Sequence, residues 1–400
     1  MTTKTVAQPG APSLRLYWST TAGAAFGYMS VYVMPVLAGP LVGAFGFDDR
    51  GIGILFTIEL LGIALSSIFI AFRTRTLNLR SVAITGAILA CIGQLLSMGA
   101  DSVNFLAGAR FLAGIGEGAA MAAAYAAVAR STMPEKAFAV SLLLVTASAV
   151  VLLYSIPQLT AIWGLRAGFG ALLTLLLLVS PGFLLLPTSA AVNPHDDTGQ
   201  APSHFPYRTL GVMALLAFVL LSLADLGIWA FAGRIGANLE IPPQQIGTIL
   251  ALSQIFGVGG GLAAAYVQVK YGRVLPFVVG LLLIACLYLG LTGAASKSIY
   301  TLCLLLLGVT TLFVYPYFTG LLAALDHAGS WTALAGSAAA IGMTFGPLTA
   351  GYLAAEYSYR VMGGAMSGAI ILALLLVLGV LSKKRGQSPL IQSQVKGPAE

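Results

Sequence analysis

Apolar residues form long, continuous runs along this chain, and short polar connections separate them. Each run has about the 20 residues that an α-helix needs to cross the hydrocarbon core of a bilayer. Strands of a transmembrane β-barrel would instead alternate apolar and polar residues. The pattern therefore predicts an all-α integral membrane protein with twelve transmembrane helices, near residues 16–43, 51–72, 81–100, 103–129, 137–160, 166–187, 207–233, 244–268, 274–294, 299–325, 331–355 and 360–382.

One polar connection is longer than the others and divides the runs into two groups of six. It is rich in Pro, Ser and acidic residues, a composition typical of a flexible linker. The predicted organisation is a cytoplasmic N-terminal tail, a six-helix bundle, a cytoplasmic linker, a second six-helix bundle and a cytoplasmic C-terminal tail, over residues 1–15, 16–187, 188–206, 207–382 and 383–400.

The two groups of six resemble copies of one unit. The basic loops that end at Arg80 and Arg273 are 193 residues apart, and Pro157 and Pro347 in the fifth helices are 190 residues apart. Six spans return a chain to the side on which it started. Similar spacings therefore indicate two six-helix pseudo-repeats in parallel orientation.

Composition contributes mainly by exclusion. Of the 400 residues, 58% are apolar and 8% are charged, whereas about 25% of the residues of a soluble domain are charged. The chain therefore cannot be a soluble enzyme, a disordered protein or a nucleic-acid-binding domain. Its expected surroundings are the lipid bilayer.

The net charge of +7 carries information about topology. If the N-terminus is cytoplasmic, 14 of the 20 basic residues lie in internal loops and tails and 4 lie outside. This distribution follows the positive-inside rule. We therefore expect a multi-pass protein of the plasma membrane, such as a bacterial inner membrane, with both termini in the cytoplasm.

The fourth apolar run contains a motif at residues 109–118, which read ARFLAGIGEG. An arginine followed by closely spaced glycines resembles the fourth-helix motif of the major facilitator superfamily, and the two six-helix halves extend that resemblance over nearly the whole chain. The resemblance implies a twelve-helix secondary transporter that moves a small-molecule substrate by alternating access. It also implies that helices 1, 4, 7 and 10 line the cavity, and we expect a monomer.

The cytoplasmic loops depart from that family's pattern. After the second helix the family has Gly-x-x-x-Asp-Arg-x-Gly-Arg-Arg or similar, and here Arg75 stands at the position of the acidic residue. Asn78, a residue type able to adopt a left-handed turn, is retained before Arg80. The expected gating residues of the two halves are Arg73, Arg75, Arg80, Lys270, Gly272 and Arg273.

Five ionisable side chains lie within or at the edge of the predicted spans, where charge is costly and usually functional. They are Glu59, Arg110, Glu117, Asp225 and Arg234. Arg110 is a candidate ligand for a substrate carboxylate or another anion, or the partner that keeps an acid deprotonated. The alternative is a structural ion pair with Glu59 or Glu117.

Three carboxyl groups are candidates for proton coupling, namely Glu117, Asp225 and Glu59. Glu117 is flanked by glycine and alanine, so another helix can approach it closely, and desolvation favours the protonated form of a carboxyl group. Its alternative is a neutral, buried acid with a hydrogen-bonded neighbour. Asp225 is a candidate proton or cation site, and its alternative is a structural pair with Arg234, which otherwise extends toward the membrane surface.

Polar side chains on the expected cavity helices suit an amphipathic or aromatic substrate. Each of these residues has packing or interfacial anchoring as its alternative role. Besides Arg110, the candidate substrate-binding residues are Tyr28, Tyr32, Tyr125, Trp229, Gln254, Tyr315 and Tyr317.

The preferred hypothesis is proton-coupled symport of a small organic anion or carboxylate, since Arg110 is expected in the cavity. Efflux of drugs or metabolites by proton antiport is the alternative, although Pro157 lacks the glycines of the Gly-Pro-x-x-Gly-Gly signature of the family's drug antiporters. A membrane-embedded enzyme is a remote alternative, because no histidine lies in a predicted span and no metal-ligand spacing is present. We expect no enzymatic activity, cofactor, metal or nucleotide, and protons as the coupling ion.

Overall fold

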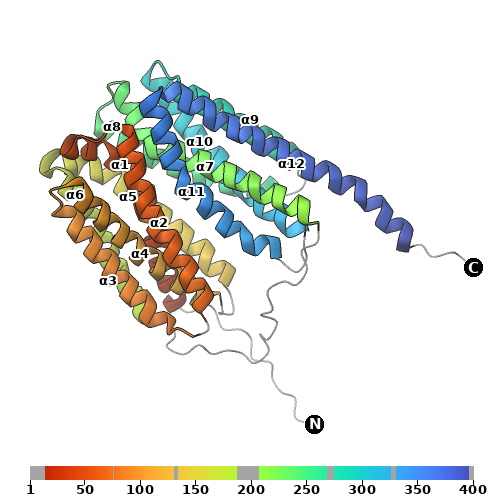
Figure 1. Ribbon diagram of the computed structural model, residues 1–400, viewed down its shortest axis with the longest axis horizontal. Coiled ribbons are helices and arrows are strands. Elements are labelled where there is room, and N and C mark those ends of the chain that lie inside the picture. The colour runs from red at the N-terminus through yellow and green to blue at the C-terminus, as the bar shows by residue number, and fades with distance from the viewer. Residues whose placement is uncertain are drawn as a thin grey trace, which may run out of the picture. The chain divides into compact units, whose positions relative to one another are not determined.

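The computed structural model is all-helical (Figure 1). It describes residues 14–74, 76–129, 134–186, 207–267, 274–325 and 330–395. Within them, twelve helices are long and apolar enough to cross a membrane, which confirms the predicted fold class. They are α1 (Leu14–Phe45), α2 (Asp49–Arg73), α3 (Leu79–Met98), α4 (Val103–Val128), α5 (Pro134–Trp163), α6 (Leu165–Val179) with the short 3-10 helix η1 (Ser180–Leu185), α7 (Arg208–Asn238), α8 (Pro243–Val267), α9 (Val274–Thr292), α10 (Lys297–Leu325), α11 (Ser330–Glu356) and α12 (Tyr359–Val395).

The last helix is longer than its apolar run. The run ends near residue 382, whereas α12 continues to Val395. Hydropathy marks where a helix leaves the apolar layer, but backbone hydrogen bonds can continue into polar sequence beyond it. The end of an apolar run is therefore a poor guide to the end of this helix.

The contacts within the chain define two compact units. Unit 1 consists of residues 1–47, 54–196 and 242–251, and it contains α1, most of α2, α3 to α6, η1 and the start of α8. Unit 2 consists of residues 48–53, 197–241 and 252–400, and it contains the start of α2, α7, most of α8 and α9 to α12.

Helices pack in corresponding pairs within the two units. In unit 1, α1 packs against α4, α5 and α6, and α3 packs against α4 and α6. In unit 2, α7 packs against α10, α11 and α12, and α9 packs against α10 and α12. Adding six to each helix number of the first set gives the second, which is the arrangement expected of two six-helix pseudo-repeats.

Glycines allow α4 to lie close to its neighbours in unit 1. A Cβ atom at Gly114 would lie 2.1 Å from the backbone oxygen of Glu59 on α2, and one at Gly116 would lie 2.3 Å from the backbone nitrogen of Ala90 on α3. Such distances leave no room for a methyl group. The glycines around Glu117 therefore place this residue on a helix held tightly between α2 and α3.

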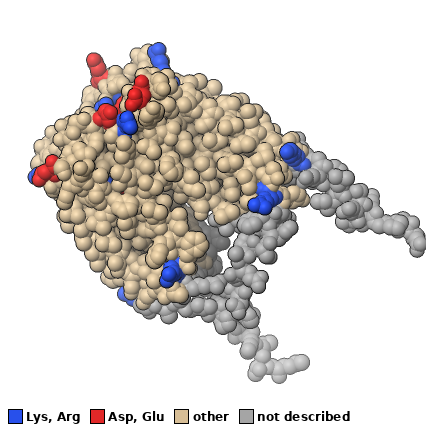
Figure 2. All heavy atoms as spheres, in the orientation of Figure 1, with Lys and Arg blue, Asp and Glu red and all other residues tan. Residues whose placement is uncertain are grey.

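The surface is consistent with a protein that lies in lipid. Charged side chains are sparse on the face drawn in Figure 2, and the surface between them is uncharged. Large apolar side chains are exposed along the helices, for example Leu65, Phe69 and Phe72 on α2. Hydrocarbon tails would cover such side chains without the free-energy cost that water imposes.

Candidate functional site

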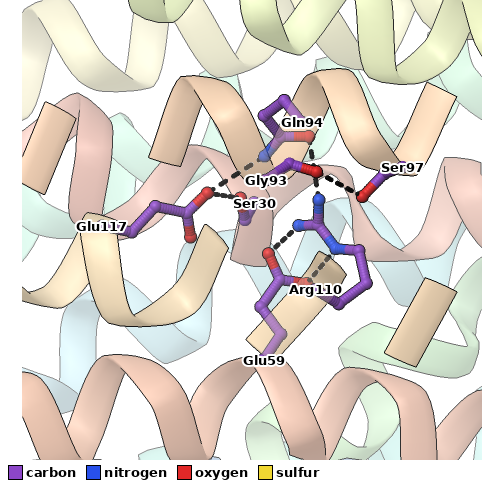
Figure 3. A network of polar contacts seen from close by, with 7 residues as sticks. All are labelled: Ser30, Glu59, Gly93, Gln94, Ser97, Arg110 and Glu117. Carbon is purple, nitrogen blue, oxygen red and sulfur yellow. Dashed lines mark hydrogen bonds and ion pairs between the residues drawn. The ribbon is translucent and has the colours of Figure 1, made fainter. Parts of the chain in front are cut away.

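Arg110 forms a buried ion pair in unit 1 (Figure 3). Its Nε donates to Oε2 of Glu59 at 3.1 Å, and its Nη2 donates to Oε1 of the same carboxylate. Its Nη1 donates to Oε1 of Gln94 on α3 at 2.8 Å, and its Cζ lies 5.2 Å from the ring centroid of Phe169 on α6. The guanidinium is thus surrounded by α2, α3 and α6. Among the roles expected for Arg110, this geometry matches the structural pair with Glu59.

Glu117 lies in the same network, and its two carboxyl oxygens differ in their surroundings. Oε1 accepts hydrogen bonds from the Ser30 hydroxyl on α1 at 2.6 Å and from Nε2 of Gln94 at 3.1 Å (Figure 3). Oε2 is buried and has no hydrogen-bond partner among the described residues. The side chain is 0% exposed and forms no ion pair within the described part of the chain. Glu117 is therefore a wholly buried acid in a network whose cation, Arg110, is already paired with Glu59.

Gln94 links the ion pair to Glu117. Its amide oxygen accepts from Arg110, so its NH₂ group is directed toward the Glu117 carboxyl group. Neither Gln94 nor Ser30 is ionisable, and a search for charged residues in the apolar runs therefore does not find them. A polar residue that interrupts an apolar run is the signal in the sequence that could have identified Gln94.

Asp225 on α7 is the acid that the sequence indicates for unit 2, and hydroxyl groups surround it. Tyr288 on α9 donates to Oδ1 at 3.4 Å, Thr311 on α10 donates to Oδ1 at 3.3 Å, and Tyr315 donates to Oδ2 at 3.4 Å. Asp225 is only partly buried. No lysine, arginine or histidine among the described residues pairs with it.

The structural pair considered for Asp225 and Arg234 is wrong. Arg234 instead donates from Nε to Oδ1 of Asp49, in the first turn of α2, at 2.9 Å, and the Tyr359 hydroxyl donates to Oδ2 of Asp49 at 2.5 Å. Residues nine apart lie on opposite faces of an α-helix, so Asp225 and Arg234 face different neighbours. Asp49 lies just before its apolar run, which is why it is absent from the charges predicted within the spans.

The tyrosines predicted on α1 and α4 lie together in unit 1. The side chains of Tyr28 and Tyr32 are both close enough to Tyr125 to interact with it electrostatically. The ring of Phe138 on α5 meets Tyr125 edge to face at a centroid distance of 4.9 Å. All three tyrosines are partly buried.

The two tyrosines that flank Pro316 on α10 have different surroundings in unit 2. Tyr315 bonds to Asp225 and meets Phe218 edge to face at 5.6 Å between ring centroids. Tyr317 is buried, and its ring packs against Phe277 and Phe313 at 6.1 and 5.3 Å. Tyr317 therefore lies among aromatic rings, while Trp229 and Gln254 are partly buried on α7 and α8.

The expected gating residues are described only in part. Arg73 is exposed at the end of α2, over the ring of Phe69 at 5.7 Å, and Arg80 lies in the first turn of α3. Asn78 has φ −74° and ψ 100°, which is an extended conformation and not the left-handed one that asparagine is able to adopt. Its side chain instead accepts from Ser81 N at 3.2 Å and caps α3. The predicted residues outside the described part of the chain are Arg75, Lys270, Gly272 and Arg273.

Comparisons with known proteins agree with this architecture. The sequence model of the Major Facilitator Superfamily matches residues 20–328 and 214–399. A search of curated proteins finds no match. Among solved structures, the nucleoside transporter NupG (D323A mutant) is 11% identical with a TM-score of 0.73, and the match covers 92% of this chain and 100% of that one.

Two further solved structures have the same fold. The D-xylose-proton symporter is 16% identical with a TM-score of 0.68, over 90% of this chain and 96% of that one. The human organic anion transporter MFSD10 is 18% identical with a TM-score of 0.66, over 92% and 100%. At such identities the structures show the fold, and the family match shows the relationship. The chain belongs to the major facilitator superfamily and is a secondary transporter.

Proposed function

We propose that this transporter couples substrate movement to protons and that Glu117 carries the proton. The supporting observation is its buried Oε2, which has no hydrogen-bond partner among the described residues. Glu59 already offsets the charge of Arg110, so an ionised Glu117 would leave a net negative charge at a wholly buried site. A proton on Oε2 removes that charge.

The ion pair then has a positioning role in this mechanism. Arg110 holds the oxygen of Gln94, and Gln94 holds Oε1 of Glu117. During alternating access, the carboxyl group passes between this buried site and one that water reaches. Because desolvation favours the protonated form, the two states differ in proton affinity, and this difference couples the proton to the conformational cycle.

The charge balance also bears on the class of substrate. The two arginines within the spans, Arg110 and Arg234, are both paired with carboxylates. Glu117 and Asp225 have no cationic partner within the described residues. This balance supports exchange of protons for a neutral or cationic organic solute.

Symport of an organic anion is the second candidate function. The observation in its favour is the bidentate geometry of Arg110, because a substrate carboxylate could occupy the positions that the Glu59 oxygens hold. This function requires Glu59 to release Arg110 when the substrate binds. It therefore predicts competition between organic acids and the ion pair.

Transport into liposomes tests the proton coupling. The substrate would be chosen by a thermal-shift screen of the purified protein against organic acids, sugars, amino acids and lipophilic cations. We expect the wild type to accumulate it under an imposed pH gradient and a protonophore to abolish accumulation. The Glu117→Gln variant should still exchange substrate at equal pH but lose accumulation, whereas Asp101→Asn, at an exposed acid between α3 and α4, should keep both.

The outcomes separate the alternatives. If Glu117→Gln still accumulates substrate, and Asp225→Asn keeps exchange at equal pH but loses accumulation, the proton carrier is on α7. Accumulation that is unchanged by the pH gradient and by the protonophore would contradict proton coupling altogether. Cation accumulation driven by proton exit supports exchange, and organic-anion accumulation driven by proton entry supports the second candidate.

A further inference from the structure

Each six-helix repeat contains a cluster of three side chains, one from each of its first, third and fourth helices. In each cluster one side chain is an acid and the other two donate hydrogen bonds to it. In unit 1 the acid is on the fourth helix, α4, and in unit 2 it is on the first helix of the repeat, α7. The corresponding positions are Ser30 and Asp225, Gln94 and Tyr288, and Glu117 and Thr311, which are 195, 194 and 194 residues apart.

Backbone packing independently supports this correspondence. In unit 1, a Cβ atom at Gly114 would lie 2.1 Å from the backbone oxygen of Glu59. In unit 2, a Cβ atom at Gly308 would lie 2.1 Å from the backbone oxygen of Ser253. Gly308 follows Gly114 by 194 residues, and Ser253 follows Glu59 by 194 residues. The carboxyl sites of the two repeats therefore occupy equivalent places in the fold.

The two sites differ in what surrounds the acid. Glu117 is wholly buried and has one oxygen without a donor, an environment that favours a neutral acid. Asp225 is partly exposed, and three hydroxyl groups from Tyr288, Thr311 and Tyr315 donate to its two oxygens. Donors to a carboxylate favour its ionised form. When Asp225 is ionised, the unit 2 site presents a negative charge with no cation among the described residues to offset it.

Aromatic rings border this negative charge. Tyr315 meets Phe218 edge to face at 5.6 Å, and Phe218 stacks on Phe318 at 5.2 Å. Trp229 follows Asp225 by one helical turn and is partly buried. The faces of aromatic rings carry partial negative charge and attract cations, most strongly when the cation is desolvated.

We propose that Asp225, with the hydroxyl groups and rings around it, binds the positively charged nitrogen of an organic amine or quaternary ammonium substrate. The inference rests on the proposed function and gives it a substrate class. The first repeat then binds the proton, and the equivalent place in the second repeat binds the substrate cation. In unit 2 the acid is Asp225, which lies in a partly exposed site lined by hydroxyl groups and binds the organic cation. In unit 1 the acid is Glu117, which is wholly buried and binds the proton.

Binding of matched probes to the purified full chain in lipid nanodiscs tests this site at a fixed pH of 7. The cationic probes are phenethylammonium and phenyltrimethylammonium, and the anions of similar size are phenylpropionate and benzenesulfonate. We expect saturable binding of at least one cation by calorimetry and no saturable binding of its anionic counterpart. The Asp225→Asn variant should weaken cation binding by about tenfold or more, which corresponds to about 1.4 kcal/mol or more.

Three variants control for folding and local geometry. Asp225→Glu keeps the charge and should bind the cation more tightly than Asp225→Asn. Tyr315→Phe keeps the ring but removes one hydroxyl group, so it should weaken binding less than Asp225→Asn, and it tests the site even if Asp225→Asn does not fold. Asp101→Asn, far from the site in sequence and exposed, should bind as the wild type does.

The inference is overturned if neither cation binds, if Asp225→Asn and Tyr315→Phe both bind cations as tightly as the wild type, or if the anions bind equally well. It is also overturned if Asp225→Asn keeps cation binding but loses accumulation under a pH gradient, because Asp225 would then be a proton site. Failure of the proposed function is a separate result, since it appears as gradient-driven accumulation by Glu117→Gln rather than as a binding constant.

Discussion

Arg110 shows how a single charge is accommodated within a membrane span. An arginine at the centre of a membrane helix costs about 2.5–3.5 kcal/mol on insertion scales. Here the Glu59 carboxylate offsets the charge, and Gln94 satisfies the remaining arm of the guanidinium. The side chains of the pair are only 3% and 4% exposed, so removing either partner leaves the other charge buried.

Replacing Arg110 should reduce stability in a graded way. Arg110→Lys keeps the charge but cannot form the two-pronged contact and the bond to Gln94, and we expect a loss of about 1–3 kcal/mol. Arg110→Gln leaves the buried Glu59 carboxyl group without its cation, so this group must either stay charged and unpaired or take up a proton, and we expect a loss of about 3–5 kcal/mol. Thermal or chemical unfolding in detergent measures both effects.

The double variant provides the control for this prediction. Glu59→Gln with Arg110→Gln removes both charges, so its loss should be smaller than the sum of the single losses. Strictly additive losses would contradict a coupled pair. If Arg110→Lys instead has the same free energy of unfolding as the wild type but a weaker affinity for substrate, Arg110 is a substrate ligand. Organic-anion symport then becomes the preferred function.

The sequence identifies the charged residues of this network more readily than it identifies the residues that they contact. Glu59, Arg110 and Glu117 are evident as charges in apolar runs. The choice of Glu59 over Glu117 as the partner of Arg110 depends on how α2, α3 and α4 are rotated against one another. Spacing along one helix carries no information about that rotation, and it also does not indicate Gln94 as the link.

At the scale of the elements, one ion pair joins the ends of three helices in unit 2. Asp49 begins α2, Arg234 lies in the last part of α7, and Tyr359 begins α12. The side chains of Asp49 and Arg234 are 12% and 23% exposed, so water screens their interaction only in part. A second ion pair nearby in sequence, Arg50 with Glu356, is 54% and 46% exposed.

The two ion pairs should respond differently to neutralisation. Asp49→Asn removes the negative charge that pairs with Arg234, and it replaces the carboxylate that accepts from the Tyr359 hydroxyl with a weaker amide acceptor. We expect the free energy of unfolding to fall by about 1–3 kcal/mol. Glu356→Gln breaks an exposed pair and should cost less than about 1 kcal/mol. Unfolding midpoints of the two variants, measured in the same detergent, provide the comparison. Equal losses would mean that burial does not distinguish the pairs.

At the scale of the whole molecule, the two repeats share a backbone plan but differ in chemistry. Apolar runs and loop spacings predict twelve helices and the duplication, and the family match agrees with both. Those patterns depend on hydropathy and chain length alone. They do not show that the acid is on the fourth helix in one repeat and on the first in the other, because that correspondence requires the contacts of Ser30, Gln94, Tyr288 and Thr311.

The second helix of each repeat provides a test of the shared plan. The start of α2 belongs to unit 2, where a Cβ atom at Gly53 would lie 2.4 Å from the backbone oxygen of Pro347 on α11. The start of α8 belongs to unit 1, where a Cβ atom at Gly247 would lie 2.4 Å from the backbone oxygen of Leu153 on α5. Gly53 and Gly247 are 194 residues apart, the same spacing as the equivalent glycines of α4 and α10.

We therefore expect Gly53→Ala and Gly247→Ala to have similar effects. Each methyl group would overlap a backbone carbonyl that cannot rotate away, and such overpacking costs about 1–3 kcal/mol. Both variants should also lower the initial rate of uptake, since each changes a helix whose residues belong to both units. Gly259→Ala on α8 is the matched control, because nothing lies within 4 Å of a Cβ atom there. Alanine has a higher helix propensity than glycine, so Gly259→Ala should leave the free energy of unfolding unchanged or raise it by up to about 1 kcal/mol. A large loss for one of the two packed glycines and none for the other would show that the repeats do not use their second helices in the same way.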